Sequence, residues 1–363
     1  MSAPRLQIDL DKIHHNASSL VVQLAERGIS VTGITKATLG SPAIAATLLR
    51  AGVRSIGDSR IENLERVRTT GQQGSKLLIR SPMISQASRV VATASTSLNT
   101  ELSVIRQLSL AAQTLGQTHS VILMIELGDL REGIMAKDLE PFVAATLRLP
   151  NIRLAGLGTN LACRKGITPD AANMGELSSL VTRIENKFGI DLGTVSGGNS
   201  ANLAWALSGA DIGRVNNLRL GESILLGREP LHRQPLAGLH TDAITLTAEV
   251  IESKTKPSQA WGVPAEATFG KVEETANRGL VAQAILAVGR QDVDEQGLRA
   301  PDGIEVVAAS SDHLVVYSDG PPLTVGDEVA FELNYSALLR AMTSPFVAQV
   351  TRGANPNKMI PAR

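Results

Sequence analysis

Lys36 is the first residue of this sequence whose surroundings suggest chemistry. It stands in the segment GITKATLG, directly after a short apolar run that predicts a strand over residues 31–35. An amine whose pKa is lowered by burial and by neighbouring charges can form a Schiff base with an aldehyde cofactor. A lone lysine is usually a solvated surface residue, so this interpretation needs support from other parts of the chain.

Two glycine-containing segments provide that support. Residues 197–200 read GGNS and residues 219–223 read RLGES, and each segment follows an expected strand. Glycine lets backbone N–H groups approach an anion, and a helix N-terminus helps to stabilise negative charge. Tight turns also need glycine, so one such loop alone would indicate little. Two such loops together with Lys36 indicate a site for a phosphate group.

The residues between about 31 and 227 alternate between short apolar runs and longer helical stretches. Strands are predicted over residues 31–35, 54–57, 76–79, 96–98, 121–127, 153–158, 194–197 and 217–220. Helices are predicted over residues 42–51, 59–69, 85–92, 101–115, 137–149, 170–188 and 201–207. Such strands pair in parallel, and eight units favour a closed (β/α)8 TIM-type barrel over an open doubly wound sheet. In a barrel, Lys36 lies at the C-terminal mouth, and the loops after strands seven and eight often bind phosphate.

The pattern changes after Gly227. Residues 228–240 carry two prolines and are typical of a linker. Strands are predicted over residues 244–251, 280–288, 304–308, 313–316 and 328–333, with turn residues between them. We therefore expect a barrel over residues 12–230 and a C-terminal all-β domain over residues 231–363. An N-terminal strand within residues 1–11 is expected to join the β domain.

The composition excludes several classes of function. The chain has 363 residues, 35 basic and 35 acidic, so its net charge of zero provides no basic field for nucleic acid or membranes. Its one cysteine excludes an intramolecular disulfide and a thiolate-only metal cage, and no metal is expected. The opening MSAPRLQIDLDK lacks the apolar run of a signal peptide, so we expect a soluble cytoplasmic protein.

Motifs spread along nearly the whole chain resemble the alanine racemase superfamily, the fold-type III pyridoxal-phosphate enzymes, and most closely its ornithine racemase branch. In chain order they are ITKATLG, SIGDSRIENL, ELGDLREG, GLGTNLAC, SGGNS, NNLRLGESILLGRE, GRQDVD, ASSDHL and LNYSALLRAMTSP. The resemblance implies a pyridoxal 5'-phosphate cofactor bound in the barrel. It also implies a homodimer whose active site is completed by the partner's β domain.

The resemblance assigns roles residue by residue. Lys36 matches the lysine that binds the cofactor covalently and acts as one acid/base. Arg219 matches the arginine that faces the pyridine nitrogen, and its permanent charge leaves that nitrogen without a full proton. Arg131 matches the arginine near the cofactor hydroxyl and the substrate carboxylate, a pairing that suits its bidentate fork.

Other matches concern the phosphate and the ring. Ser200, with the backbone of Gly221 and Glu222, matches the phosphate ligands. Tyr335 matches the tyrosine that reaches the phosphate from the β domain. Asn160 stands where alanine racemases place a histidine against the cofactor ring.

One departure concerns the second catalytic base, which in the family is a tyrosine from the partner subunit. Phe269, in the segment TFGK, takes its place here and cannot carry a proton. His313 and Cys163 are candidates for the missing group, with His313 placed slightly ahead of Cys163, and a single lysine serving both faces is the alternative. Asp312 is a further candidate, or it could hold the ammonium group of a substrate side chain.

These matches imply a racemase that interconverts the L and D forms of a basic amino acid such as ornithine or lysine. A decarboxylase or aldolase on the same fold is the first alternative, because those chemistries do not need proton transfer on both faces. A non-catalytic pyridoxal-phosphate-binding protein is the second alternative, although the β domain argues against it.

Overall fold

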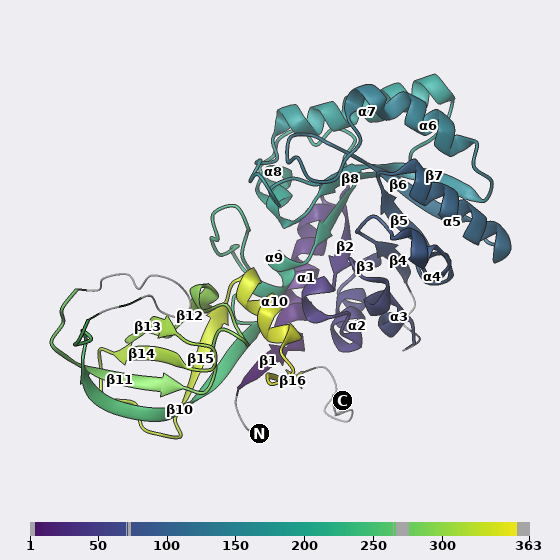
Figure 1. Cartoon of the computed structure of the whole chain (residues 1–363). Helices are drawn as coiled ribbons and strands as arrows, with labels where there is room; N and C mark the ends of the chain where they lie inside the picture. The colour runs from purple at the N-terminus through teal and green to yellow at the C-terminus, as the bar shows by residue number, and fades with distance from the viewer. Residues whose placement is uncertain (1–3, 70, 72–73, 264, 266–275, 354–363) are drawn as a thin grey trace. The chain divides into compact units, whose positions relative to one another are not determined.

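The computed structural model describes residues 4–69, 71, 74–263, 265 and 276–353. The chain divides into two compact units, labelled by element in Figure 1. One unit comprises residues 12–240, and the other comprises residues 1–11 together with residues 241–363.

The first unit is built on a closed barrel of eight strands. These are β2 (Ser30–Ile34), β3 (Ser55–Asp58), β4 (Ser75–Leu78), β5 (Thr96–Asn99), β6 (His119–Ile125), β7 (Ile152–Thr159), β8 (Thr194–Gly198) and β9 (Asn217–Leu220). Each strand pairs in parallel with its neighbours, and the barrel closes where Ser30 of β2 lies opposite Asn217 of β9. The predicted (β/α)8 barrel is therefore confirmed, and the open sheet is excluded.

Helices connect the strands of this unit. The α-helices are α1 (Leu10–Ala25), α2 (Pro42–Arg50), α3 (Ile61–Thr69), α4 (Ala87–Thr93), α5 (Leu102–Thr114), α6 (Leu139–Leu147), α7 (Ala171–Phe188), α8 (Leu203–Leu207) and α9 (Glu222–Leu226). The 3-10 helices are η1 (Lys36–Thr38), η2 (Ile84–Gln86), η3 (Ala136–Asp138) and η4 (Ser200–Asn202). Helix α7 begins where the sequence predicts, because the Asp170 side chain accepts a 2.9 Å hydrogen bond from Asn173 N. Helices α1 and α9 were not among the predicted helices.

The two halves of the barrel differ in polarity. On β4, β5 and β6, Leu77, Leu98, Ile122 and Met124 form one buried apolar cluster. On the other side, Asn217 of β9 accepts a 2.9 Å hydrogen bond from Ser196 Oγ and donates one of 3.1 Å to Thr32 Oγ1. Because buried polar groups need partners, this hydrogen-bonded side of the barrel is where a charged side chain can be accommodated.

The second unit is a mainly antiparallel sheet in the order β12-β15-β10-β11-β14-β13. Its strands are β1 (Arg5–Asp9), β10 (Ile244–Pro257), β11 (Leu280–Leu286), β12 (Leu298–Arg299), β13 (Ile304–Ala309), β14 (Leu314–Ser318), β15 (Glu328–Leu333) and β16 (Ala348–Arg352). Strand β1, from the start of the chain, pairs with β10 and with β16. The unit also contains η5 (Glu295–Gly297) and helix α10 (Tyr335–Thr343), which the sequence analysis did not predict.

Among the residues that the structure describes, no helix is both long enough and apolar enough to cross a lipid bilayer.

Candidate active site

Lys36 begins η1, two residues after the end of β2, and therefore lies at the C-terminal mouth of the barrel. Burial lowers the pKa of its amine. The positive charges of Arg131 and Arg219 lower the pKa of Lys36 further, whereas Cys163 and Asp58 raise it. A lysine with a lowered pKa is neutral more often near neutral pH, and the neutral amine is the form that attacks an aldehyde.

Asp58 supports the backbone beside this lysine. It ends β3, is fully buried, and accepts hydrogen bonds from Thr35 Oγ1 at 2.8 Å and Asn63 Nδ2 at 3.0 Å. Burial raises the pKa of its carboxyl group, and the bonds it accepts oppose that shift. Because Thr35 directly precedes Lys36, Asp58 helps to fix the orientation of the lysine. No role for Asp58 was predicted from the sequence, although it lies within the motif SIGDSRIENL.

Arg219 carries a buried positive charge on β9. Only 4% of the residue is exposed. Its Nη1 donates to Ser196 Oγ at 2.6 Å, and its Nη2 donates to Thr159 O at 2.8 Å and to Asn160 Oδ1 at 3.2 Å. Burial lowers the pKa of Arg219 to about 10, so the guanidinium is still charged at neutral pH. All three of these acceptors are neutral, and a buried cation held by neutral groups is typical of a functional site.

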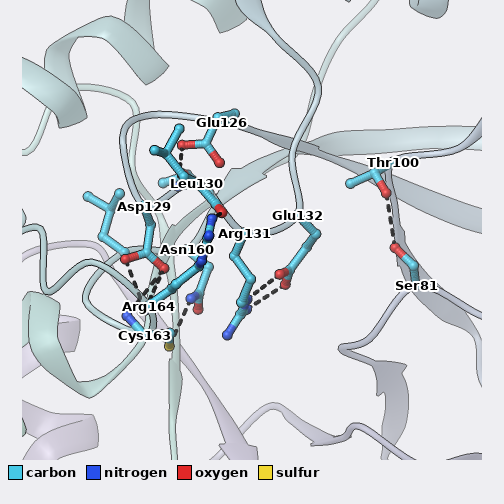
Figure 2. A network of polar contacts seen from close by, with 12 residues as sticks. Ser81, Thr100, Glu126, Asp129, Leu130, Arg131, Glu132, Asn160, Cys163 and Arg164 are labelled. Atoms are coloured by element: carbon cyan, nitrogen blue, oxygen red, sulfur yellow. Dashed lines mark hydrogen bonds and ion pairs between the residues drawn. The ribbon is translucent and has the colours of Figure 1, made fainter.

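Asn160 connects this cation to the thiol of Cys163. The Oδ1 of Asn160 accepts from Arg219, while its Nδ2 donates to Cys163 Sγ at 3.0 Å (Figure 2). Asn199 Nδ2 contacts the same sulfur at 3.5 Å and Asn160 Oδ1 at 3.2 Å. The cysteine is exposed, so the sulfur is both held by amide groups and accessible.

Arg131 comes from the loop between β6 and η3. Its Nε and Nη2 donate to the carboxylate of Glu132 (Figure 2), and 41% of its side chain is exposed. The charge of Cys163 acts on the pKa of Arg131 as well as on that of Lys36, so the three groups lie within electrostatic range of one another. The adjacent acid Glu132 was not assigned a role from the sequence.

The two glycine loops meet at a pair of serines. Ser200 Oγ lies 3.0 Å from Ser223 Oγ and accepts a 3.2 Å hydrogen bond from Ser223 N, and both serines are buried. Gly198 has φ of 146°, which other residues rarely adopt, and a Cβ on Gly221 would lie 3.1 Å from the Cβ of Ile34. The backbone conformation at Gly198 therefore requires glycine, whereas a side chain at Gly221 would be in tight contact with Ile34.

The loop after β9 also lies near the lysine. Burial raises the pKa of Glu222, and the charges of Arg233 and Lys36 oppose that rise. The Glu222 side chain forms a 3.0 Å ion pair with Arg233. The Glu222 side chain is thus paired with Arg233, and the resemblance assigns only the backbone of Glu222 to the phosphate.

Three predicted site residues belong to the β unit. Asp312 and His313 connect β13 to β14, and His313 Nδ1 lies 2.9 Å from Asp312 Oδ1. Their side chains are 61% and 46% exposed, respectively, so this pair is open to a ligand. Tyr335 begins α10, whose N-terminus is capped by Asn334 Oδ1, 2.9 Å from Ala337 N. Phe269 lies outside the described residues.

Comparison with known proteins identifies the family. Residues 8–229 match the alanine racemase N-terminal domain family. The chain belongs to the alanine racemase family. It is 37% identical over 353 residues to a lysine racemase of Thermotoga maritima, a match that spans 96% of this chain and 99% of that protein. It is 36% identical over 349 residues to an ornithine racemase of Acetoanaerobium sticklandii, spanning 95% and 98% of the two chains.

The fold of this alanine racemase family member also matches solved structures. The crystal structure of alanine racemase from Streptomyces lavendulae superposes with a TM-score of 0.75 over 98% of each chain, at 18% identity. The family resemblance and the fold class expected from the sequence are thus confirmed. Eight of the predicted site residues lie in the barrel unit, namely Lys36, Arg131, Asn160, Cys163, Ser200, Arg219, Gly221 and Glu222.

Proposed function

We propose that this member of the alanine racemase family is a pyridoxal-phosphate-dependent racemase that interconverts the L and D forms of a basic amino acid. One observation carries the proposal. The barrel unit combines the Lys36 amine, whose pKa is lowered, with the buried cation Arg219, whose hydrogen-bond acceptors are all neutral. The 37% and 36% identities to a lysine racemase and an ornithine racemase support this reaction and this substrate class.

The residues present fit pyridoxal 5'-phosphate. Lys36 would hold its aldehyde carbon, and Arg219 would face its ring nitrogen. The joined loops around Ser200 and Gly221 would hold its phosphate, with backbone N–H groups, including that of Glu222, as donors. Tyr335 and Asn160 are proposed as further contacts to the phosphate and to the ring. Bound in this way, the cofactor would withdraw electrons from the substrate's α-carbon and make its proton acidic.

The chain's own groups then handle the proton. The neutral amine of Lys36 can remove a proton from one face of the α-carbon and return it. The charged Arg219 does not give its proton to the ring nitrogen, because its pKa of about 10 stays above neutral pH. By leaving the ring nitrogen without a full proton, Arg219 would weaken the electron withdrawal that the cofactor supplies, and this would disfavour side reactions.

A second group is proposed to serve the opposite face, since Phe269 cannot carry a proton. Cys163 is the better supported candidate, because it belongs to the same barrel unit as Lys36, its sulfur accepts a hydrogen bond from Asn160, and it is exposed. His313 remains the other candidate, held at 2.9 Å from Asp312 in the β unit. Arg131, paired with Glu132, is proposed to bind the substrate carboxylate.

The substrate's side chain and the assembly complete the proposal. A basic side chain needs a carboxylate partner, and Asp312, with its side chain 61% exposed, is our proposed partner for the ammonium group. We further propose a homodimer in which the partner's β domain completes each active site, and a cytoplasmic location. Light scattering of the purified protein at micromolar concentration tests the dimer directly.

The decisive experiment is a panel of L-amino acids incubated with the purified holoenzyme, followed by chiral chromatography. We expect D-lysine or D-ornithine to form, with L-alanine and other neutral amino acids converted far more slowly. Carbon dioxide and aldehyde release are measured in the same samples. Release of either product without racemisation would replace the proposal with the decarboxylase or aldolase alternative, and no reaction with any amino acid would refute it.

A further inference from the structure

We propose that Asp129 is a positioning residue whose carboxylate locks the loop after β7 to the loop after β6. This inference rests on the proposed function only in the role it gives to Cys163 and Arg131. The lock itself is defined by contacts within the barrel unit. Asp129 stands in the motif ELGDLREG, and no role for it follows from that motif.

The lock consists of one buried carboxylate and three successive backbone amides. Asp129 is 1% exposed. Its Oδ2 accepts from Cys163 N at 3.3 Å, its Oδ1 accepts from Lys165 N at 2.9 Å, and both oxygens lie 3.1 Å from Arg164 N (Figure 2). A carboxylate that accepts several N–H groups makes stronger hydrogen bonds than a neutral acceptor would. The backbone N–H groups of residues 163–165 thus converge on the Asp129 carboxylate, which lies 34 to 36 residues earlier in the chain.

Two further features show that both loops are held in a defined conformation. The guanidinium of Arg164 donates to the carbonyl oxygen of Leu130, which adds a second bond between the loops. Leu130 and Ala162 have φ values of 53° and 62°, a left-handed conformation that costs free energy for residues other than glycine. Such conformations persist where surrounding contacts determine them, and they occur preferentially at functional sites.

The locked segment carries the groups on which the chemistry depends. Asn160 and Cys163 lie on the β7 loop, and Arg131 lies two residues after Asp129 on the β6 loop. Asn160 in turn contacts the buried cation Arg219. Asp129 accepts hydrogen bonds from the backbone N–H groups of residues 163–165, so it acts through the backbone that presents these side chains. Its predicted effect is on the placement of Cys163 relative to Arg131 and Lys36.

The first test needs no mutation. Hydrogen–deuterium exchange of the wild-type holoenzyme reports the amides of residues 163–165. If the lock holds, these loop amides exchange at least about tenfold more slowly than in an unstructured peptide. Exchange at the unstructured rate would overturn the proposal.

The second test compares Asp129→Asn with the control Asp138→Asn. Asp138 is an exposed acid on the same connection, and its side chain caps no helix. In Asp129→Asn an amide group replaces one acceptor oxygen and faces a backbone N–H, so the loop should open. Because the chain has one cysteine, alkylation by iodoacetamide reports on Cys163 alone. We expect the alkylation rate constant to rise about tenfold in Asp129→Asn and to stay at the wild-type value in the control.

Kinetics separate positioning from simple destabilisation. Misplacing a reacting group by about 1 Å can cost about 100-fold in rate, so we expect Asp129→Asn to lose kcat to about that extent. The visible absorbance of the bound cofactor should be retained, since Lys36 lies on a different loop. Wild-type alkylation and wild-type kcat in a folded Asp129→Asn would overturn the proposal. If the protein is no racemase, exchange and alkylation still decide whether the lock exists.

Discussion

Arg219 and Asn160 are joined by a 3.2 Å hydrogen bond from the guanidinium Nη2 to the amide Oδ1. The other amide atom of Asn160 donates to the sulfur of Cys163. The amide of Asn160 thus contacts the buried guanidinium of Arg219 through its oxygen and the exposed thiol of Cys163 through its nitrogen, so one side chain is in hydrogen-bond contact with both groups.

Replacing Lys36 should abolish cofactor binding and turnover together. In Lys36→Ala no amine remains to hold the aldehyde, so the visible absorbance should disappear and kcat should fall about a thousandfold or more. Absorbance spectra and chiral assays measure both effects. Lys137→Ala, at an exposed lysine of η3, is the control. A borohydride-reducible cofactor adduct in Lys36→Ala would show that another residue binds the cofactor.

Replacing Arg219 should change the balance between reactions. Arg219→Glu would place a carboxyl group where a cation stood, and the ring nitrogen could then gain a proton. A stronger electron sink favours transamination, so we expect the ratio of transamination to racemisation to rise about tenfold. Ketoacid release and chiral chromatography provide this ratio. An unchanged ratio and an unchanged spectrum would argue against a ring contact by Arg219.

The isotope content of the product distinguishes one base from two. A single lysine that serves both faces would carry the substrate's own α-hydrogen into the product, whereas two bases exchange it with solvent. We expect little deuterium in the product after a single turnover of α-deuterated lysine in light water. Substantial internal return would contradict the two-base mechanism.

Variants of the two candidate groups identify the second base. Cys163→Ala should lose racemisation while keeping the cofactor's visible absorbance, and we expect His313→Ala to be affected less. Cys163→Ser is the conservative comparison, because a hydroxyl is a much weaker acid than a thiol. Full activity in both alanine variants would exclude both residues.

His119 should make stability depend on pH between about 4 and 6.5. It is 1% exposed on β6, its Nε2 lies 2.8 Å from Ser97 Oγ, and burial lowers its pKa from 6.5 to about 4. As the pH falls through 6.5, the unfolded chain gains a proton that the folded chain does not, so the free energy of unfolding decreases. The total loss is on the order of 3 kcal/mol and levels off below about pH 4.

Urea unfolding of wild type and His119→Gln at pH 7 and pH 5 measures this contribution. The variant should lose less stability over that interval, because glutamine does not titrate. The exposed His232→Gln is the control and should behave like the wild type. An identical pH dependence in all three proteins would show that His119 does not couple protonation to folding.

Local signals along the chain were enough to predict the barrel and to place Lys36 after its first strand. Strand and helix signals are local: Ser41 and Pro42 start α2, Asp170 caps α7, and buried strands read as short apolar runs. Helix α10 was missed although Asn334 caps it, because it is a short helix that follows directly on a predicted strand. The position of Lys36 after the first barrel strand was likewise readable from order along the chain.

The contacts that hold these residues in place could not be predicted from the sequence, because they join segments that are distant along the chain. The contacts of Asp58 with Thr35, of Asp129 with the amides of residues 163–165, and of Asn199 with Asn160 join segments that are 23 to 39 residues apart. Such bonds depend on where two loops come to lie after the barrel has closed, and no local pattern encodes that distance. The burial that lowers the pKa of Lys36 has the same origin, because it comes from the combined packing of several strands around one amine.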